Sequence, residues 1–115
     1  SPLLDAALSV LPKDKVAENK PSLSATFSTD FGDLSHVLPV FSFSTSGLSG
    51  EAHSANVRVV DPYKAYILPT KIMALAVYQL LKDGAAQAKK IRQEQKPPFT
   101  RDEYVAFLDS ITGKN

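Results

Sequence analysis

Prolines limit where this chain can form regular structure, because a proline fixes its own φ angle and cannot donate a backbone hydrogen bond. Leucines and alanines recur at helical spacing up to Pro12, so residues 1–11 are predicted to form a helix that ends there. The Pro97–Pro98 pair similarly separates two stretches of helical character near the end of the chain. The chain is thereby divided into short segments, each of which can be interpreted separately.

Residues 12–60 are predicted to contain loops and one or two short strands. A polar linker leads into a brief extended piece at Ser22–Phe27. Val37–Ser44 is rich in β-forming residues and alternates in polarity, and Pro39 is tolerated near the start of a strand or on a sheet edge. Residues 45–51 form a flexible Gly/Ser loop, and Val57–Val60 can extend as a second strand.

Residues 61–83 are predicted to form a kinked helix. Asp61 followed by Pro62 is a strong start signal, with a carboxylate at the N-cap and proline at the first helical position. Pro69 lies inside the apolar stripe that follows and removes one hydrogen bond, at a cost of about 3 kcal/mol if nothing relieves it. Gly84 is a good helix stop.

Residues 85–113 are predicted to form a helical tail. Its first part is polar and rich in helix-forming residues, typical of a helix that faces solvent. After the proline pair, Thr100 and Glu103 have the spacing of a capping box, and Tyr104 begins an apolar face. Gly113 ends this last helix.

Bulk composition excludes several classes of function. A net charge of +1 over 115 residues argues against a nucleic-acid partner. The chain has no cysteine, so it can form neither a disulfide nor a thiolate zinc site, and it suits a reducing, cytoplasmic compartment. No apolar stretch is long enough to span a membrane. The polar helix predicted after residue 84 also lacks the aromatic or leucine face of a helix that binds a membrane surface.

Polar groups concentrate between Ser28 and His36, just before the first predicted strand. This window holds two carboxylates, three hydroxyls and an imidazole. In α/β enzymes, chemistry is commonly placed where polar side chains gather at one end of a strand. The window and the second histidine, His53, are therefore the candidate functional residues.

The run Ser28–Pro39, followed by Ala52, His53 and Ser54, resembles a segment of the dinuclear zinc peptidase and amidohydrolase family. This family includes aminoacylases and bacterial carboxypeptidases, and the aminobenzoyl-glutamate-hydrolase branch is the most similar. In that branch a Ser-Thr-Asp-x-Gly-Asp/Asn-x-Ser-x-Val-x-Pro run precedes a His-Thr/Ser pair and an alanine-rich helix. The resemblance covers residues 20–83.

The resemblance implies a C-terminal segment of an α/β zinc-peptidase catalytic domain, helix-rich with one or two short strands. In that reading His53 is a ligand of a two-zinc site, Ser28, Thr29 and Asp30 line the substrate side, and no catalytic residue lies in this segment. The implied activity is hydrolysis of amide bonds in N-acyl amino acids or dipeptides. The N-terminal part of the same enzyme would supply the other ligands, and a lid domain absent from this chain would support a homodimer.

Two departures leave an alternative open. The family usually has an acidic or aromatic residue soon after its histidine, where this chain has Ala55, Asn56 and Val57. The earlier ligand motifs of the family are also absent. The alternative is a non-catalytic helical interaction module, or a degenerate relative of the family. His36 is expected to be a packed, hydrogen-bonded histidine and not a ligand, and Asp33 can equally cap a turn or a helix.

Overall fold

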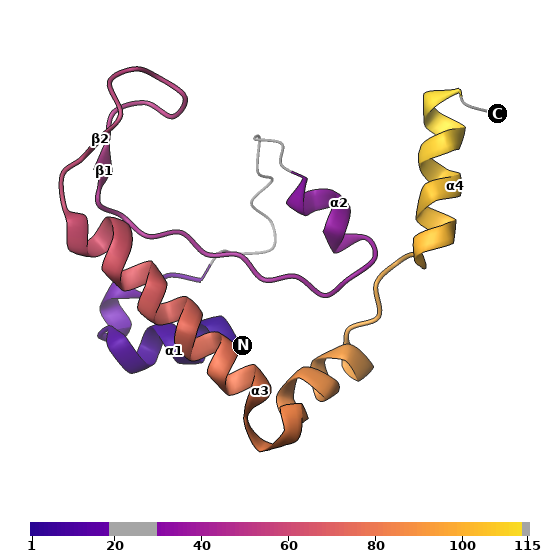
Figure 1. Cartoon of the computed structure of the whole chain (residues 1–115), viewed down its shortest axis with the longest axis horizontal. Coiled ribbons are helices and arrows are strands. Elements are labelled where there is room, and N and C mark those ends of the chain that lie inside the picture. Colours follow the sequence, from indigo (N-terminus) through magenta and orange to yellow (C-terminus); the bar gives the residue numbers. More distant parts are fainter. Residues whose placement is uncertain (19–29, 114–115) are drawn as a thin grey trace. The chain divides into compact units, whose positions relative to one another are not determined.

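The computed structural model describes residues 1–18 and 30–113, which belong to two compact units. The first unit comprises Ser1–Glu18 and Ser42–Gln87, and the second comprises Asn19–Phe41 and Ala88–Asn115. Figure 1 shows the elements along the chain, most of which are helices. The predicted helix-rich character is therefore confirmed for the described residues.

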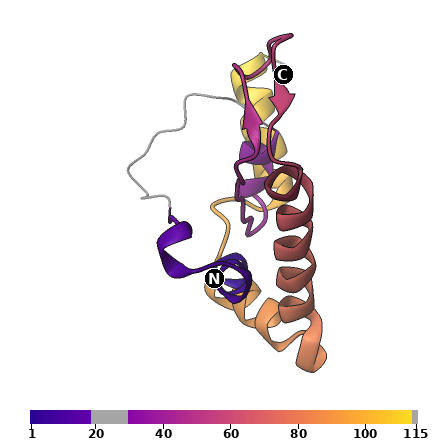
Figure 2. The ribbon, with the colours of Figure 1, turned by 90° about the vertical axis from the view of Figure 1, so that its left-hand side faces the viewer.

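The core of the first unit lies between two helices, α1 (Pro2–Val10) and α3 (Leu68–Glu94), seen in Figures 1 and 2. Ala6 of α1 packs with Leu68, Ile72 and Ala76 of α3, and Phe43 lies against this cluster. The helix predicted over residues 1–11 is confirmed. A short 3-10 helix at Lys13–Lys15 follows it.

A wide turn precedes α3. Tyr63–Ile67 forms a π-helix, in which the N–H of Leu68 donates to the carbonyl of Tyr63. The predicted start is confirmed, because a carboxylate oxygen of Asp61 accepts the backbone N–H of Lys64 at 3.1 Å. The α geometry begins at Leu68, so Pro69 lies in the first turn of α3, where its missing N–H has little cost. The kink predicted at Pro69 is not found there, because the non-helical backbone angles inside α3 lie at residues 82–85.

The helix α3 is interrupted at residues 82–85. Lys82 has an extended ψ of 162°, and Asp83, Gly84 and Ala85 all have left-handed backbone angles with φ between 53° and 66°. The stop predicted at Gly84 is therefore confirmed. A second helical part continues to Glu94, as predicted for the start of the tail.

The sheet is a two-stranded antiparallel hairpin of β1 (Leu48–Ser49) and β2 (Arg58–Val59), with Leu48 opposite Val59. The strand predicted at 57–60 is confirmed in its centre. The strand predicted at Val37–Ser44 is wrong: this stretch has no ladder partner among the described residues, and the backbone of residues 39–46 makes no backbone hydrogen bond with them. The loop predicted at 45–51 contains β1, and the piece predicted at Ser22–Phe27 lies outside the described residues.

Gly47 attaches the hairpin to the start of the helical segment. Its carbonyl accepts the backbone N–H groups of Val60 and Asp61 at 2.9 and 3.1 Å. Its φ is +113°, and a Cβ at this position would lie 2.6 Å from the backbone nitrogen of Ala65. Only glycine fits such a close approach without strain.

The second unit contains α2 (Phe31–Ser35) and α4 (Arg101–Thr112). The predicted capping box of α4 is confirmed: Thr100 Oγ1 accepts the N–H of Glu103 at 3.3 Å, and a carboxylate oxygen of Glu103 accepts the N–H of Thr100 at 2.7 Å. The backbone N–H of Thr100 and its hydroxyl, which lies 2.8 Å from the same carboxylate oxygen, lower the pKa of Glu103. The left-handed Gly113 ends α4, as predicted. The helix α2, in contrast, lies where the sequence predicted only a loop.

Candidate functional site

His53, the predicted metal ligand, lies in the loop that joins β1 to β2. Its backbone is left-handed with φ of 62°, its side chain is exposed, and its ring has no hydrogen-bond or ion-pair partner among the described residues. Left-handed backbone is uncommon for a residue with a side chain and is found in turns and functional sites. A nitrogen of the His53 ring is therefore accessible to a metal ion.

Short local contacts fix the loop around His53. The hydroxyl of Ser54 lies 2.8 Å from the carbonyl of Glu51 and also contacts the side-chain amide of Asn56. At the other end of the loop, Gly50 lies close to the backbone of Asn56. A Cβ at position 50 would lie 2.6 Å from the carbonyl oxygen of Asn56. The loop is thus shaped by its own residues.

Of the three predicted substrate-side residues, the structure describes one. Ser28 and Thr29 lie outside the described residues. Asp30 precedes α2, is exposed, and has a carboxylate without a hydrogen-bond or ion-pair partner in the described part of the chain. Asp30 belongs to the second unit and His53 to the first, so each is placed only within its own unit.

The second unit does bring together three side chains, two from α2 and the residue that follows it and one from α4. The hydroxyl of Tyr104 donates to Asp33 Oδ1 at 2.6 Å, across 71 positions of sequence. The ring of His36 stacks on the ring of Tyr104, with centroids 5.0 Å apart and planes 15° from parallel. His36 also has its backbone carbonyl bonded to the N–H of Phe99 at 3.1 Å. We call Asp33, His36 and Tyr104 the α2–α4 cluster.

Hydrogen bonds define the protonation of this cluster. His36 Nδ1 lies 2.9 Å from the carbonyl oxygen of Gly32, which can only accept, so Nδ1 carries the proton. The acceptor Asp33 raises the pKa of the Tyr104 phenol, and burial of the phenol adds to this effect. A phenolate beside a carboxylate would be repelled, so the neutral phenol is the stable form.

Sequence reasoning missed Tyr104 as a partner of the polar window. It placed Tyr104 on the apolar face of the last helix, which is correct, since its ring is 9% exposed and packs with Phe99 and Phe107. The expectation that His36 is packed and hydrogen-bonded is confirmed. The spacing of Asp33 and Tyr104 gave no signal, because contacts across 71 residues follow no local period.

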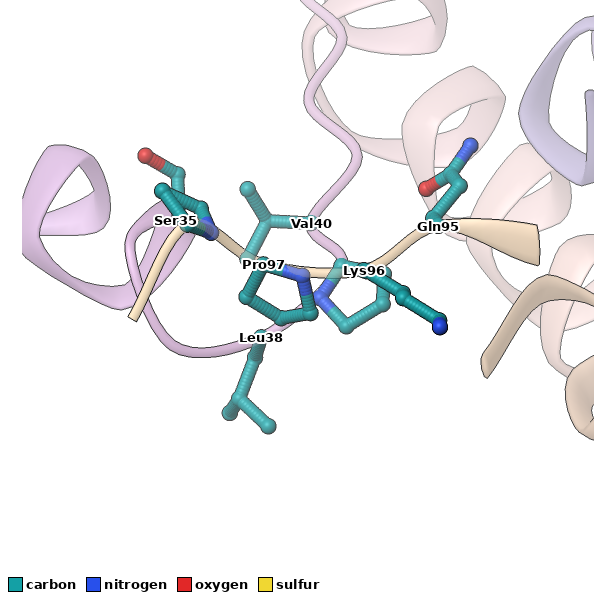
Figure 3. Close-up of a pocket in the computed structure, with 8 residues that line it drawn as sticks. Ser35, Leu38, Val40, Gln95, Lys96 and Pro97 are labelled. Atoms are coloured by element: carbon teal, nitrogen blue, oxygen red, sulfur yellow. The ribbon is translucent and has the colours of Figure 1, made fainter. Parts of the chain in front are cut away.

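A hollow of about 250 Å³ lies beside the cluster, between the end of the polar window and the linker before α4. Figure 3 shows Ser35, Leu38 and Val40 on one segment and Gln95, Lys96 and Pro97 on the other. The walls of the hollow are mainly apolar, and the lining residues are Ser35, Leu38, Pro39, Val40, Gln95, Lys96, Pro97 and Pro98. None of these is a carboxylate or an imidazole, and the walls can hold an apolar group.

The residues that the structure describes contain no group of three or more His, Asp or Glu side chains placed to hold a metal ion. A zinc ion bound at His53 would therefore take its other protein ligands from another polypeptide segment. Within the described residues, no helix combines the length and the apolar character needed to cross a membrane.

No protein-family description, curated protein or solved structure matches this chain.

Proposed function

We propose that this chain is the C-terminal segment of a cytoplasmic, zinc-dependent amidohydrolase or peptidase with an α/β catalytic domain. Its substrates would be N-acyl amino acids or dipeptides. The observation that carries the proposal is the accessible ring of His53, without a partner in the described part of the chain, at a left-handed position of a locally fixed loop. The residues around it are those on which the family resemblance rests.

The two histidines differ in their surroundings. A zinc-bound histidine coordinates through one ring nitrogen, and its other ring N–H is commonly held by a carbonyl or a carboxylate. The ring of His53 is exposed and has no partner in the described part of the chain, and the resemblance assigns it the ligand role. His36 donates Nδ1–H to Gly32, which by itself leaves Nε2 free, but its ring stacks on Tyr104 and the resemblance assigns it no metal role.

The remaining parts of the site belong to the N-terminal part of the enzyme. A catalytic zinc requires about three protein ligands, and the described residues contain no group of three that could hold one. When bound, a pair of zinc ions lowers the pKa of a bridging water and polarises the amide carbonyl that the water attacks. In this proposal the exposed carboxylate of Asp30, with Ser28 and Thr29, forms part of the substrate wall and orients the substrate.

The test is complementation. The chain is combined with the N-terminal part of the enzyme and zinc, and hydrolysis of an N-acetyl amino acid is measured. We expect His53→Ala to lower activity by roughly a hundredfold or more, because loss of a ligand costs at least as much as loss of its supporting contacts. We expect no turnover from the 115-residue chain alone.

The matched control is His36→Phe, which retains an aromatic ring against Tyr104 and should keep activity within a few-fold of the wild type. Hydrolysis by the isolated chain, or wild-type activity in the His53→Ala protein, would contradict the proposal.

One observation favours the second candidate, a non-catalytic interaction module. The side of α3 that faces away from α1 is apolar and exposed, and Tyr78 and Leu81 are 65% and 62% accessible. Apolar surface of this kind is typical of a region that another polypeptide covers.

A further inference from the structure

The first helical part of α3 is apolar on two opposite sides. Leu68, Ile72 and Ala76 face α1 and are buried. The opposite side, which we call the outer face of α3, consists of Thr70, Met73, Ala74, Val77, Tyr78 and Leu81. All six are exposed. Exposed apolar side chains gathered on one side of a helix are typical of a surface that a partner covers, so the outer face calls for a covering partner.

Charge beside the outer face restricts what can cover it. Residues 62–82 contain three lysines and no carboxylate. Lys64 pairs with Asp61 at 2.9 Å, whereas Lys71 and Lys82 form no ion pair with the described residues. Helical spacing of 100° per residue puts Lys71 and Lys82 along one edge of the outer face. An occupant with carboxylates along its own edge is therefore favoured.

The outer face of α3 in a second copy does not supply carboxylates along its edge. An antiparallel pair of outer faces would bring lysine edges together with no carboxylate between them. Like charges placed opposite one another across an interface are unfavourable. Charge thus argues against an antiparallel face-to-face α3 pair.

The helix α4 does supply carboxylates along one edge. It carries three carboxylates and one cation over Arg101–Thr112. Val105 is 46% exposed, and helical spacing puts Asp102 and Asp109 two turns apart on one edge beside it. The exposed Ile111 lies on the opposite side of the helix from Asp102, near Tyr104. Neither aspartate forms an ion pair with the described residues, so both carboxylates are available to the lysines of another copy.

We propose that the outer face of α3 binds α4 of a second copy of this chain, with Asp102 and Asp109 beside Lys71 and Lys82. In a two-fold dimer this contact occurs twice, which doubles an area that would be small for one helix pair. The proposal goes beyond the hydrolase assignment and does not depend on zinc. It also uses a surface of this chain and not a lid domain.

The test is a charge swap followed by sedimentation equilibrium. One variant carries Lys71→Glu and Lys82→Glu, and the other carries Asp102→Lys and Asp109→Lys. Each variant alone places like charges at both contacts, so its dimer dissociation constant should rise at least roughly tenfold over that of the wild type. Mixed together, the two variants restore opposite charges at both contacts and should dimerise as the wild type does.

Circular dichroism checks that each variant folds, and the single changes Lys82→Glu and Asp109→Lys replace any double variant that does not. Ser110→Lys on α4 is the matched control for charge alone. A wild-type chain that remains monomeric at all concentrations overturns the proposal. So does a dimer whose strength is unchanged in both variants, or variants that do not recover on mixing.

Discussion

At the scale of single residues, the α2–α4 cluster is the most specific contact that the structure adds. Tyr104 donates to Asp33 and supports the ring of His36, so one side chain holds two residues of the polar window. A neutral phenol is needed for this hydrogen bond. Because folding raises the pKa of Tyr104, the cluster contributes stability below the unfolded-state pKa of tyrosine and loses it as pH rises through the folded-state value.

We therefore predict an alkaline transition that belongs to Tyr104. The difference between ultraviolet pH titrations of the wild type and Tyr104→Phe isolates this phenol, and it should ionise above pH 10. Asp33→Asn removes the negative charge and should move the transition downward. Tyr104→Phe should also lose less stability than the wild type as pH is raised past this range. A Tyr104 transition unaffected by Asp33→Asn would show that the hydrogen bond does not form.

Individual residues were predictable from sequence where their partners are close along the chain. Thr100 with Glu103 and Asp61 with Lys64 are local contacts, and the capping signals predicted the helix starts that they form. Asp33 and Tyr104 could not be paired, because no local rule links them. The metal role of His53 remains a prediction that rests on the resemblance.

At the scale of elements, the interruption of α3 is its most unusual feature. Asp83 and Ala85 hold left-handed backbone angles that cost L-residues roughly 1 kcal/mol each, while Gly84 adopts such angles freely. The break occurs where the apolar stripe of the first helical part ends, after Leu81. The sequence predicted this stop from Gly84 alone.

The break reverses the usual effect of glycine. In a continuous helix Ala85→Gly would destabilise the chain by about 1 kcal/mol. At a left-handed position it should instead be neutral or stabilise the chain by up to about 1 kcal/mol. Ala88→Gly, inside the second helical part, is the control and should destabilise by about 1 kcal/mol. Chemical denaturation measures both, and equal losses in the two variants would mean that α3 is unbroken.

Strands were predicted less well than helices, for a physical reason. A helix closes its hydrogen bonds within itself, whereas a strand needs a neighbour. Val37–Ser44 has the composition of a strand but no ladder partner among the described residues, so it forms none. The segment 48–49 looks like a loop by composition and pairs because the hairpin brings residues 58–59 beside it.

At the scale of the whole molecule, little side-chain surface is fully buried. The buried apolar side chains in the described part of the chain are those of Pro2, Ala6, Leu68, Ile72, Ala76 and Tyr104. Composition and periodicity predicted a helix-rich chain and the stripe along α3. They could not show which side of that stripe α1 would cover, because both sides are apolar.

The two sides of α3 should differ sharply in their response to truncation. Ile72→Ala removes a buried side chain from the α1–α3 contact and should lower the free energy of unfolding by about 2–4 kcal/mol. Val77→Ala on the outer face should cost less than about 0.5 kcal/mol in dilute solution. Urea denaturation at low protein concentration measures both. Equal losses would mean that α1 does not cover the Ile72 side.

The wide turn at Tyr63–Ile67 has a consequence for how the gene can vary in length. A π turn accommodates about one residue more than an α turn. Deleting a single codon there would convert the turn to ordinary α geometry, while Leu68, Ile72 and Ala76 would keep their rotational phase on α3. The same deletion after Pro69 would turn that side of the helix by about 100° away from α1.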